Sequence, residues 1–216
     1  MFLKISAMKK LLKEAYKYNR LIIGHNETKP ELPGGYYITN GDNWIVWVEQ
    51  NSIKKEFLAA LIEVVGELPE TGKFYRDGAE TGKQTDDDDE TLSGTENKIL
   101  EKFVIPARTK PGEKFNITNF ILIQTYADAR VLQSETGEIT LMNESFVKTL
   151  NLGAIDEEAG EYIPQGPIRI EETNWQSWDS GLCVFAVRER YCDDEKPAVS
   201  KALKLLETID LNDKEI

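Results

Sequence analysis

One hairpin constrains the fold of this chain more than any other feature. Residues 36–39 and 44–48 are rich in β-branched and aromatic side chains, and Asn40-Gly41 between them accepts the positive φ angles of a tight turn. Both faces of the second strand carry large apolar groups, as in Trp44-Ile45-Val46-Trp47-Val48. The pattern predicts that this strand lies inside a sheet and not at its edge.

Two amphipathic helices are expected on either side of the hairpin. Ser6 is a candidate N-cap for the first helix and Ser52 for the second, which Gly66 would end. Apolar residues at helical spacing mark the buried side of the first helix: Met8, Leu11, Leu12 and Ala15. The corresponding positions of the second helix are Phe57, Leu58, Leu61, Val64 and Val65.

The first helix is basic in a very acidic protein. Only one acid, Glu14, precedes residue 21, whereas the whole chain carries a formal net charge of −12. The basic side chains in that stretch are Lys4, Lys9, Lys10, Lys13, Lys17 and Arg20. Because the lysines recur every three or four residues, they share the helix side opposite the apolar one. A localised surface that faces anions is therefore predicted.

The remaining pattern is mostly that of strands. Strands are expected at residues 2–5, 21–24, 73–76, 120–126, 129–134, 139–142, 168–170 and 182–188. A short helix is expected over 144–150, and a last one from Pro197. We predict an α+β fold, mostly antiparallel sheet packed on a few helices, in two similar halves. These are a basic-helix and hairpin half, 1–105, and a β-rich half with a C-terminal helix, 106–216.

Two polar segments carry alternative interpretations. Residues 77–97 include Asp86 to Glu90, and they predict a mobile, solvated loop; a cation site would need alternating ligands and a spaced glycine. Trp175 and Trp178 stand in a polar stretch that we interpret as a loop. They could form a platform on which a ligand stacks, or clamp that loop onto the core, and the second is favoured.

Catalytic signatures are missing. His25 is the only histidine and has no nucleophile motif beside it, and the chain has no glycine-rich phosphate loop. Cys183, in an apolar strand, reads as a buried thiol, and with Cys192 it has neither metal-site nor redox spacing. We therefore expect no enzyme, cofactor or metal. The absence of a signal peptide and of a long apolar stretch predicts a cytoplasmic protein that does not enter a membrane.

The order of elements from Leu3-Lys4-Ile5 to Lys73-Phe74-Tyr75, the first third of the chain, resembles a domain of the DNA sliding clamp. In that family of replication processivity factors, basic helices line a ring around duplex DNA and sheets form its outside. The resemblance implies contact with the DNA backbone, partners among DNA-processing proteins, and a homo-oligomer. It places six lysines against the phosphates: Lys9, Lys10, Lys13, Lys17, Lys54 and Lys55.

Three function classes follow. The leading one is a non-enzymatic DNA-binding or DNA-processing accessory protein of a phage or mobile element, which neutralises phosphates without reading bases. The alternative is an acidic interaction or inhibitor protein whose surface meets a basic partner and imitates DNA. The third is an enzyme whose site carries no known motif, which a pocket joining His25 to cysteine or carboxylate side chains would favour.

Overall fold

The computed structural model describes residues 2–76, 99–123, 127–151, 164–190 and 197–211, with the side chains of 197–199 left out. The strands in these residues are β1 Ile22–Asn26, β2 Gly35–Thr39, β3 Trp44–Glu49, β4 Phe74–Arg76, β5 Pro111–Leu122, β6 Ala129–Ser134, β7 Ile139–Asn143, β8 Gln165–Ile170, β9 Trp175–Asp179 and β10 Cys183–Arg188. They form one ten-stranded sheet in the order β4-β1-β2-β3-β10-β9-β8-β5-β6-β7. Each strand pairs antiparallel with its neighbours, which confirms the predicted α+β class.

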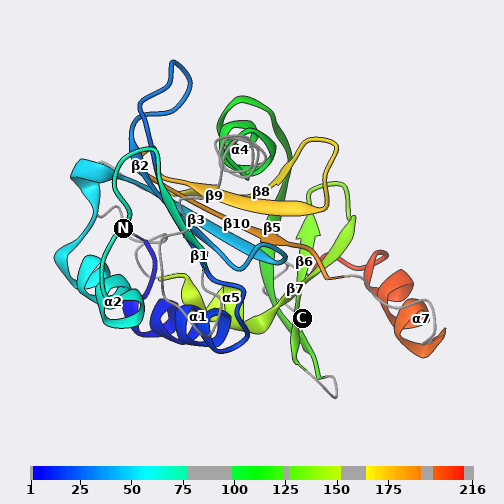
Figure 1. The fold of residues 1–216 in the computed structure, drawn as a ribbon. Coiled ribbons are helices and arrows are strands. Elements are labelled where there is room, and N and C mark those ends of the chain that lie inside the picture. Colours follow the sequence, from blue (N-terminus) through cyan, green and yellow to red (C-terminus); the bar gives the residue numbers. More distant parts are fainter. Residues whose placement is uncertain (1, 77–98, 124–126, 152–163, 191–196, 212–216) are drawn as a thin grey trace.

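Helices cover both faces of this sheet (Figure 1). The α-helices are α1 Ile5–Lys17, α2 Lys55–Val65, α4 Ile105–Thr109, α5 Glu144–Thr149 and α7 Pro197–Leu206. A 3-10 turn, η1 Gln50–Ser52, precedes α2, and a π-helical stretch, η2 Leu100–Val104, leads into α4. In Figure 1, α1, α2 and α5 lie below the sheet, α4 lies above it, and α7 lies beyond β6 and β7.

The hairpin β2–β3 has the predicted form and the predicted place. Gly41 in its turn has a φ of +80°, and β3 pairs with β2 on one side and β10 on the other. The alternating side chains of β3 enter two different cores. Val46 packs in the core under α1 and α2, whereas Trp47 packs in the core under η2 and α4. This two-sided burial explains why nearly every residue of the strand is apolar.

Both predicted N-caps are wrong. Helix α1 begins at Ile5 with Lys4 as its N-cap, and α2 begins at Lys55 with Lys54 as its N-cap; neither cap residue makes a side-chain hydrogen bond to its helix. Ser52 lies in η1 instead, where its hydroxyl donates to Glu49. The predicted strand over residues 2–5 is reduced to a single bridge between Leu3 and Leu150.

Three other elements differ from the sequence prediction. The strand expected at 120–126 is β5, which starts at Pro111 and ends at Leu122, and its Pro-Gly start is typical of a turn. Helix α4 and η2 were not expected, because Pro106 interrupts their apolar pattern. The stretch with Trp175 and Trp178 is strand β9 and not a loop. Both indoles are buried, which excludes an exposed stacking platform.

Some expectations are left open by the described residues. The acidic segment 77–97 lies outside them, and the division at residue 105 stays a prediction. None of the described helices is both long and apolar enough to span a membrane.

Candidate nucleic-acid interface

Helix α1 separates its apolar and basic side chains by spacing alone. Met8, Leu11, Leu12 and Ala15 are buried against the sheet. The lysines between them point away: Lys10, Lys13 and Lys17 are exposed and Lys9 is half-buried. The predicted basic side of α1 is therefore confirmed, and core packing does not need it.

Helix α2 packs beside α1, and one acidic residue joins the two. The Nζ of Lys9 lies 2.7 Å from one carboxylate oxygen of Glu63, and the Nζ of Lys13 lies 2.9 Å from the other. Hydrogen bonds and charge from both ammonium groups lower the pKa of Glu63 to about 2. The structure thus brings the two lysine-bearing helices together, and a single carboxylate occupies two of their six lysines.

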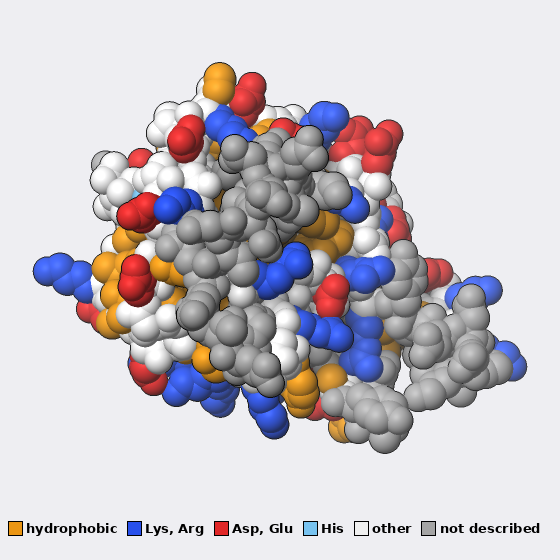
Figure 2. Space-filling view, viewed as in Figure 1, with side chains coloured by type: hydrophobic (Ala, Val, Ile, Leu, Met, Phe, Trp, Pro, Cys, Tyr) orange, Lys and Arg blue, Asp and Glu red, His pale blue; other side chains and the backbone are white. Residues whose placement is uncertain are grey.

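The other four lysines of the predicted set are not paired with any carboxylate that the structure describes. Lys10, Lys54 and Lys55 have no ion-pair partner among the described residues, and Lys17 lies 5.4 Å over the ring of Tyr18. Residues 4–20 and 54–65 together hold eight Lys or Arg and three Glu, a net of +5 in a chain of −12. Figure 2 shows blue side chains gathered at the lower edge of the molecule, where Figure 1 places α1.

Both helices begin in a way that disfavours their own stability. A helix N-terminus carries a partial positive charge, so Lys4, Lys54 and Lys55 are unfavourable there, and an N-cap side chain that bonds the free N–H groups is missing. The same features favour an anion, because unbonded N–H groups and ammonium groups both attract it.

A hollow of about 270 Å³ opens beside the C-terminal half of α1. Helix α1, the β2–β3 turn and the start of α5 surround it, and Leu11, Ala15, Trp44 and Phe146 form its apolar wall. Polar groups at the hollow come from Glu14, Tyr18, Arg20, Asn40, Asn43, Asn143 and Ser145. The sequence did not indicate this hollow, because its residues come from three distant segments and none of those segments carries a binding motif.

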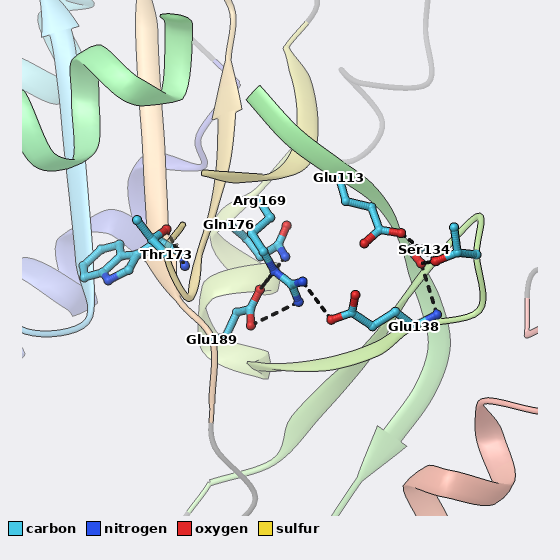
Figure 3. Close-up of polar contacts among 9 residues, drawn as sticks. Glu113, Ser134, Glu138, Arg169, Thr173, Gln176 and Glu189 are labelled. Carbon is cyan, nitrogen blue, oxygen red and sulfur yellow. Dashed lines mark hydrogen bonds and ion pairs between the residues drawn. The ribbon is translucent and has the colours of Figure 1, made fainter. Parts of the chain in front are cut away.

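A second polar cluster surrounds Arg169 on β8 (Figure 3). Its guanidinium donates to Glu189 at 2.8 Å and to Glu138 at 2.7 Å, and it lies 4.6 Å from the ring centroid of Phe115. Gln176, fully buried on β9, also donates to Glu189. Because the arginine occupies the centre of the cluster, these contacts join β5, β8, β9 and the β6–β7 turn, and we assign them a structural role.

A linked chain of hydrogen bonds continues from Glu138 to β5. The backbone N–H of Glu138 donates to the Ser134 hydroxyl, which lies 2.8 Å from the hydroxyl of Thr136. Thr136 donates to Glu113 at 2.7 Å. The Thr136 and Ser134 hydroxyls lower the pKa of Glu113, so this carboxyl stays ionised and does not hold a proton to transfer.

His25 and Cys183 are both buried, and among the described residues neither contacts the other. His25 is buried in β1, stacks on Tyr36 with 4.3 Å between ring centroids, and has Nδ1 3.4 Å from the Thr71 hydroxyl. Burial raises the pKa of the Cys183 thiol to about 12, so it stays a thiol, as the sequence indicated. Within the described ranges, no three His, Cys, Asp or Glu side chains are grouped to hold a metal ion.

Comparisons of this chain with protein-family models, with curated proteins and with solved structures found no match.

Proposed function

We propose that this protein is a non-enzymatic DNA-binding accessory protein that contacts the phosphate backbone through α1 and α2. The observation that carries the proposal is the pairing of the two lysine-bearing helices on one side of the sheet, with Lys10, Lys17, Lys54 and Lys55 unoccupied by described carboxylates. Phosphate neutralisation by such a surface gives affinity without sequence preference.

The starts of the two helices support the same proposal. Lys4 and Lys54 stand where Ser, Thr, Asp or Asn would stabilise the helix by about 0.5–2 kcal/mol. A sequence that breaks a local stability rule twice, each time toward positive charge, points to a use for that charge outside the fold.

The arrangement of the sheet supports a clamp-like architecture in two similar halves. The Leu3 bridge, α1 and the meander β1-β2-β3 form one unit, and β7, α5 and the meander β8-β9-β10 form another in the same order. The two meanders meet at β3 and β10. From either end of the order β1-β2-β3-β10-β9-β8, three strands therefore follow one another in chain order up to that contact. In this scheme α5, with its exposed Lys148, is the counterpart of α1, and α2 is an additional helix beside it.

The proposal is tested by reversing the charge of three lysines at each of two different places. Lys10, Lys17 and Lys55 are replaced by glutamate in one variant, and the exposed Lys110, Lys201 and Lys204 in a matched control. Binding to circular and linear duplex DNA is measured over a range of salt, with circular dichroism to check the fold. Circular DNA is needed because a ring that only encircles duplex can slip off short linear fragments.

We expect the wild-type protein to bind with a log–log salt slope of about −0.9 per phosphate neutralised, the first variant to lose binding, and the control to keep most of it. Equal losses in both variants would show that only net charge matters. A folded wild-type protein that binds neither form at low salt would remove the DNA proposal and favour the acidic-surface alternative, in which a basic protein is the partner.

A further inference from the structure

The hollow beside α1 has the size of a site for one flat ring. Its volume is about 270 Å³, below the roughly 300–1,000 Å³ of sites that take drug-sized ligands. Its wall is made by Leu11, Ala15, Trp44 and Phe146, each at most 6% exposed. These four side chains leave almost no surface open, so the ring on which a planar ligand can stack is that of Tyr18, which is 60% exposed at the same hollow.

Two amide groups at the hollow are held in a known orientation. The Oδ1 of Asn40 accepts hydrogen bonds from three backbone N–H groups, those of Asp42, Asn43 and Trp44, at 2.9 to 3.3 Å. The Oδ1 of Asn143 accepts from the Ser145 N–H at 2.9 Å. Because both oxygens are engaged, each side chain has its NH₂ group left to donate to a ligand.

The polar groups at the hollow include both hydrogen-bond donors and acceptors, and this combination restricts which ligand fits. Asn40 and Asn143 offer donors, whereas the Glu14 carboxylate offers only acceptors. Arg20, the cation at the hollow, is paired with Asp42 at 2.7 Å, so a phosphate, which has acceptors alone, would face the Glu14 carboxylate with no unpaired arginine to offset it. A nucleobase presents donors and acceptors along one edge and two apolar faces, which match the polar groups of the hollow and the exposed ring of Tyr18.

The position of the hollow connects it with the lysines. Tyr18, 60% exposed, stands at the hollow next to Lys17, whose Nζ lies over its ring. Helix α1 thus borders the hollow and also carries the lysines. We propose that the hollow binds one unpaired nucleobase of the DNA held by the helical lysines, an inference that rests on the proposed function.

The experiment compares two circular duplexes, one fully paired and one with a single-nucleotide gap that leaves a base unpaired. Ser145→Trp fills the hollow from its exposed side, and Asn43→Ala removes an amide at the hollow whose side chain makes no described hydrogen bond. Asn119→Trp, at an exposed position of β5, is the matched control. Circular dichroism checks that each variant is folded.

We expect the wild-type protein to bind the gapped circle about tenfold more tightly than the paired one, since stacking one unpaired base on an exposed ring such as that of Tyr18 adds about 1–3 kcal/mol. Ser145→Trp should remove that preference and keep the affinity for paired DNA, Asn43→Ala should reduce the preference, and Asn119→Trp should change neither. Equal wild-type affinities for the two circles would overturn the base site and leave the backbone proposal standing. A preference that survives in folded Ser145→Trp would also overturn it. No binding to either circle would remove both proposals.

Discussion

Glu63 sets how much of the basic surface is available. Its carboxylate holds Lys9 and Lys13 at 2.7 and 2.9 Å, so it joins α1 to α2, and under the proposed function it would compete with phosphates for those two lysines. Because the pKa of Glu63 in the folded protein, about 2, lies below the ordinary 4.5, the ion pairs contribute stability above about pH 4.5. That contribution is lost as the pH falls toward 2.

The pKa of Glu63 can be measured by following its carboxyl carbon in an NMR titration. We expect a midpoint near pH 2 in the wild-type protein. Lys13→Met removes one of the two ammonium groups and should raise the midpoint toward its ordinary value, whereas Lys10→Met, on the same helix but unpaired, should not. A wild-type midpoint near 4.5 would show that the two ion pairs do not persist in solution.

Replacing Glu63 by glutamine should strengthen DNA binding. The change frees Lys9 and Lys13, so the affinity should rise and the salt slope should steepen by about 0.9 for each lysine that gains a phosphate. Glu56→Gln, on the same helix and with the same change of charge, is the control. Glu56 has no described ion pair, so its replacement should raise the affinity only through the change in net charge. Identical salt slopes in the two variants would mean that Glu63 does not compete with DNA.

The helices and strands differ in how well they can be predicted from the sequence. The hairpin β2–β3 was predictable because strand composition, turn residues and two-sided apolar character agree within the 13 residues 36–48. The N-caps could not be predicted, because Ser6 and Ser52 fit the N-cap preference for serine better than Lys4 and Lys54, which are the N-caps in the structure. Element β5 was mispredicted because its buried side chains are few and far apart: Phe115 and Thr118 are the buried positions in a strand that starts with Pro-Gly.

The candidate site also has a part that the sequence predicts and a part that it does not. The basic side of α1 follows from spacing along one helix, so the sequence contains it. The ion pair of Lys9 with Glu63 joins residues 54 apart, and the hollow joins α1, the hairpin turn and α5, so both depend on how the chain packs. Such long-range contacts have no local signal that a single sequence could provide.

The start of α2 can separate stability from binding. Lys54→Ser supplies the missing N-cap, so the free energy of unfolding should rise by about 1 kcal/mol in urea denaturation, while the affinity for DNA should fall. Lys54→Ala removes the same charge without a cap, and it should weaken binding equally without the gain from capping. A Lys54→Ser variant with unchanged DNA affinity would take Lys54 out of the interface.

The molecule as a whole combines a repulsive net charge with one attractive side. At −12 overall, it should be driven away from DNA at a distance, and only the side formed by α1 and α2, with a local net of +5, can approach it. The opposite side of the sheet, under η2 and α4, is a second closed core, and residues 100–110 there hold Lys102, Arg108 and Lys110 against Glu101, a net of +2, with Arg108 paired to Asp179. One orientation on DNA is therefore expected.

That orientation is tested most directly by lysine footprinting. The protein, alone and bound to circular duplex DNA at low salt, is briefly acetylated at low stoichiometry, and the modified lysines are located by mass spectrometry. We predict protection by DNA at Lys10, Lys13, Lys17, Lys54 and Lys55, and unchanged reactivity at Lys110, Lys114, Lys201 and Lys204. Protection spread evenly over both groups, or confined to the second, would contradict the assignment of α1 and α2 as the DNA-contacting side.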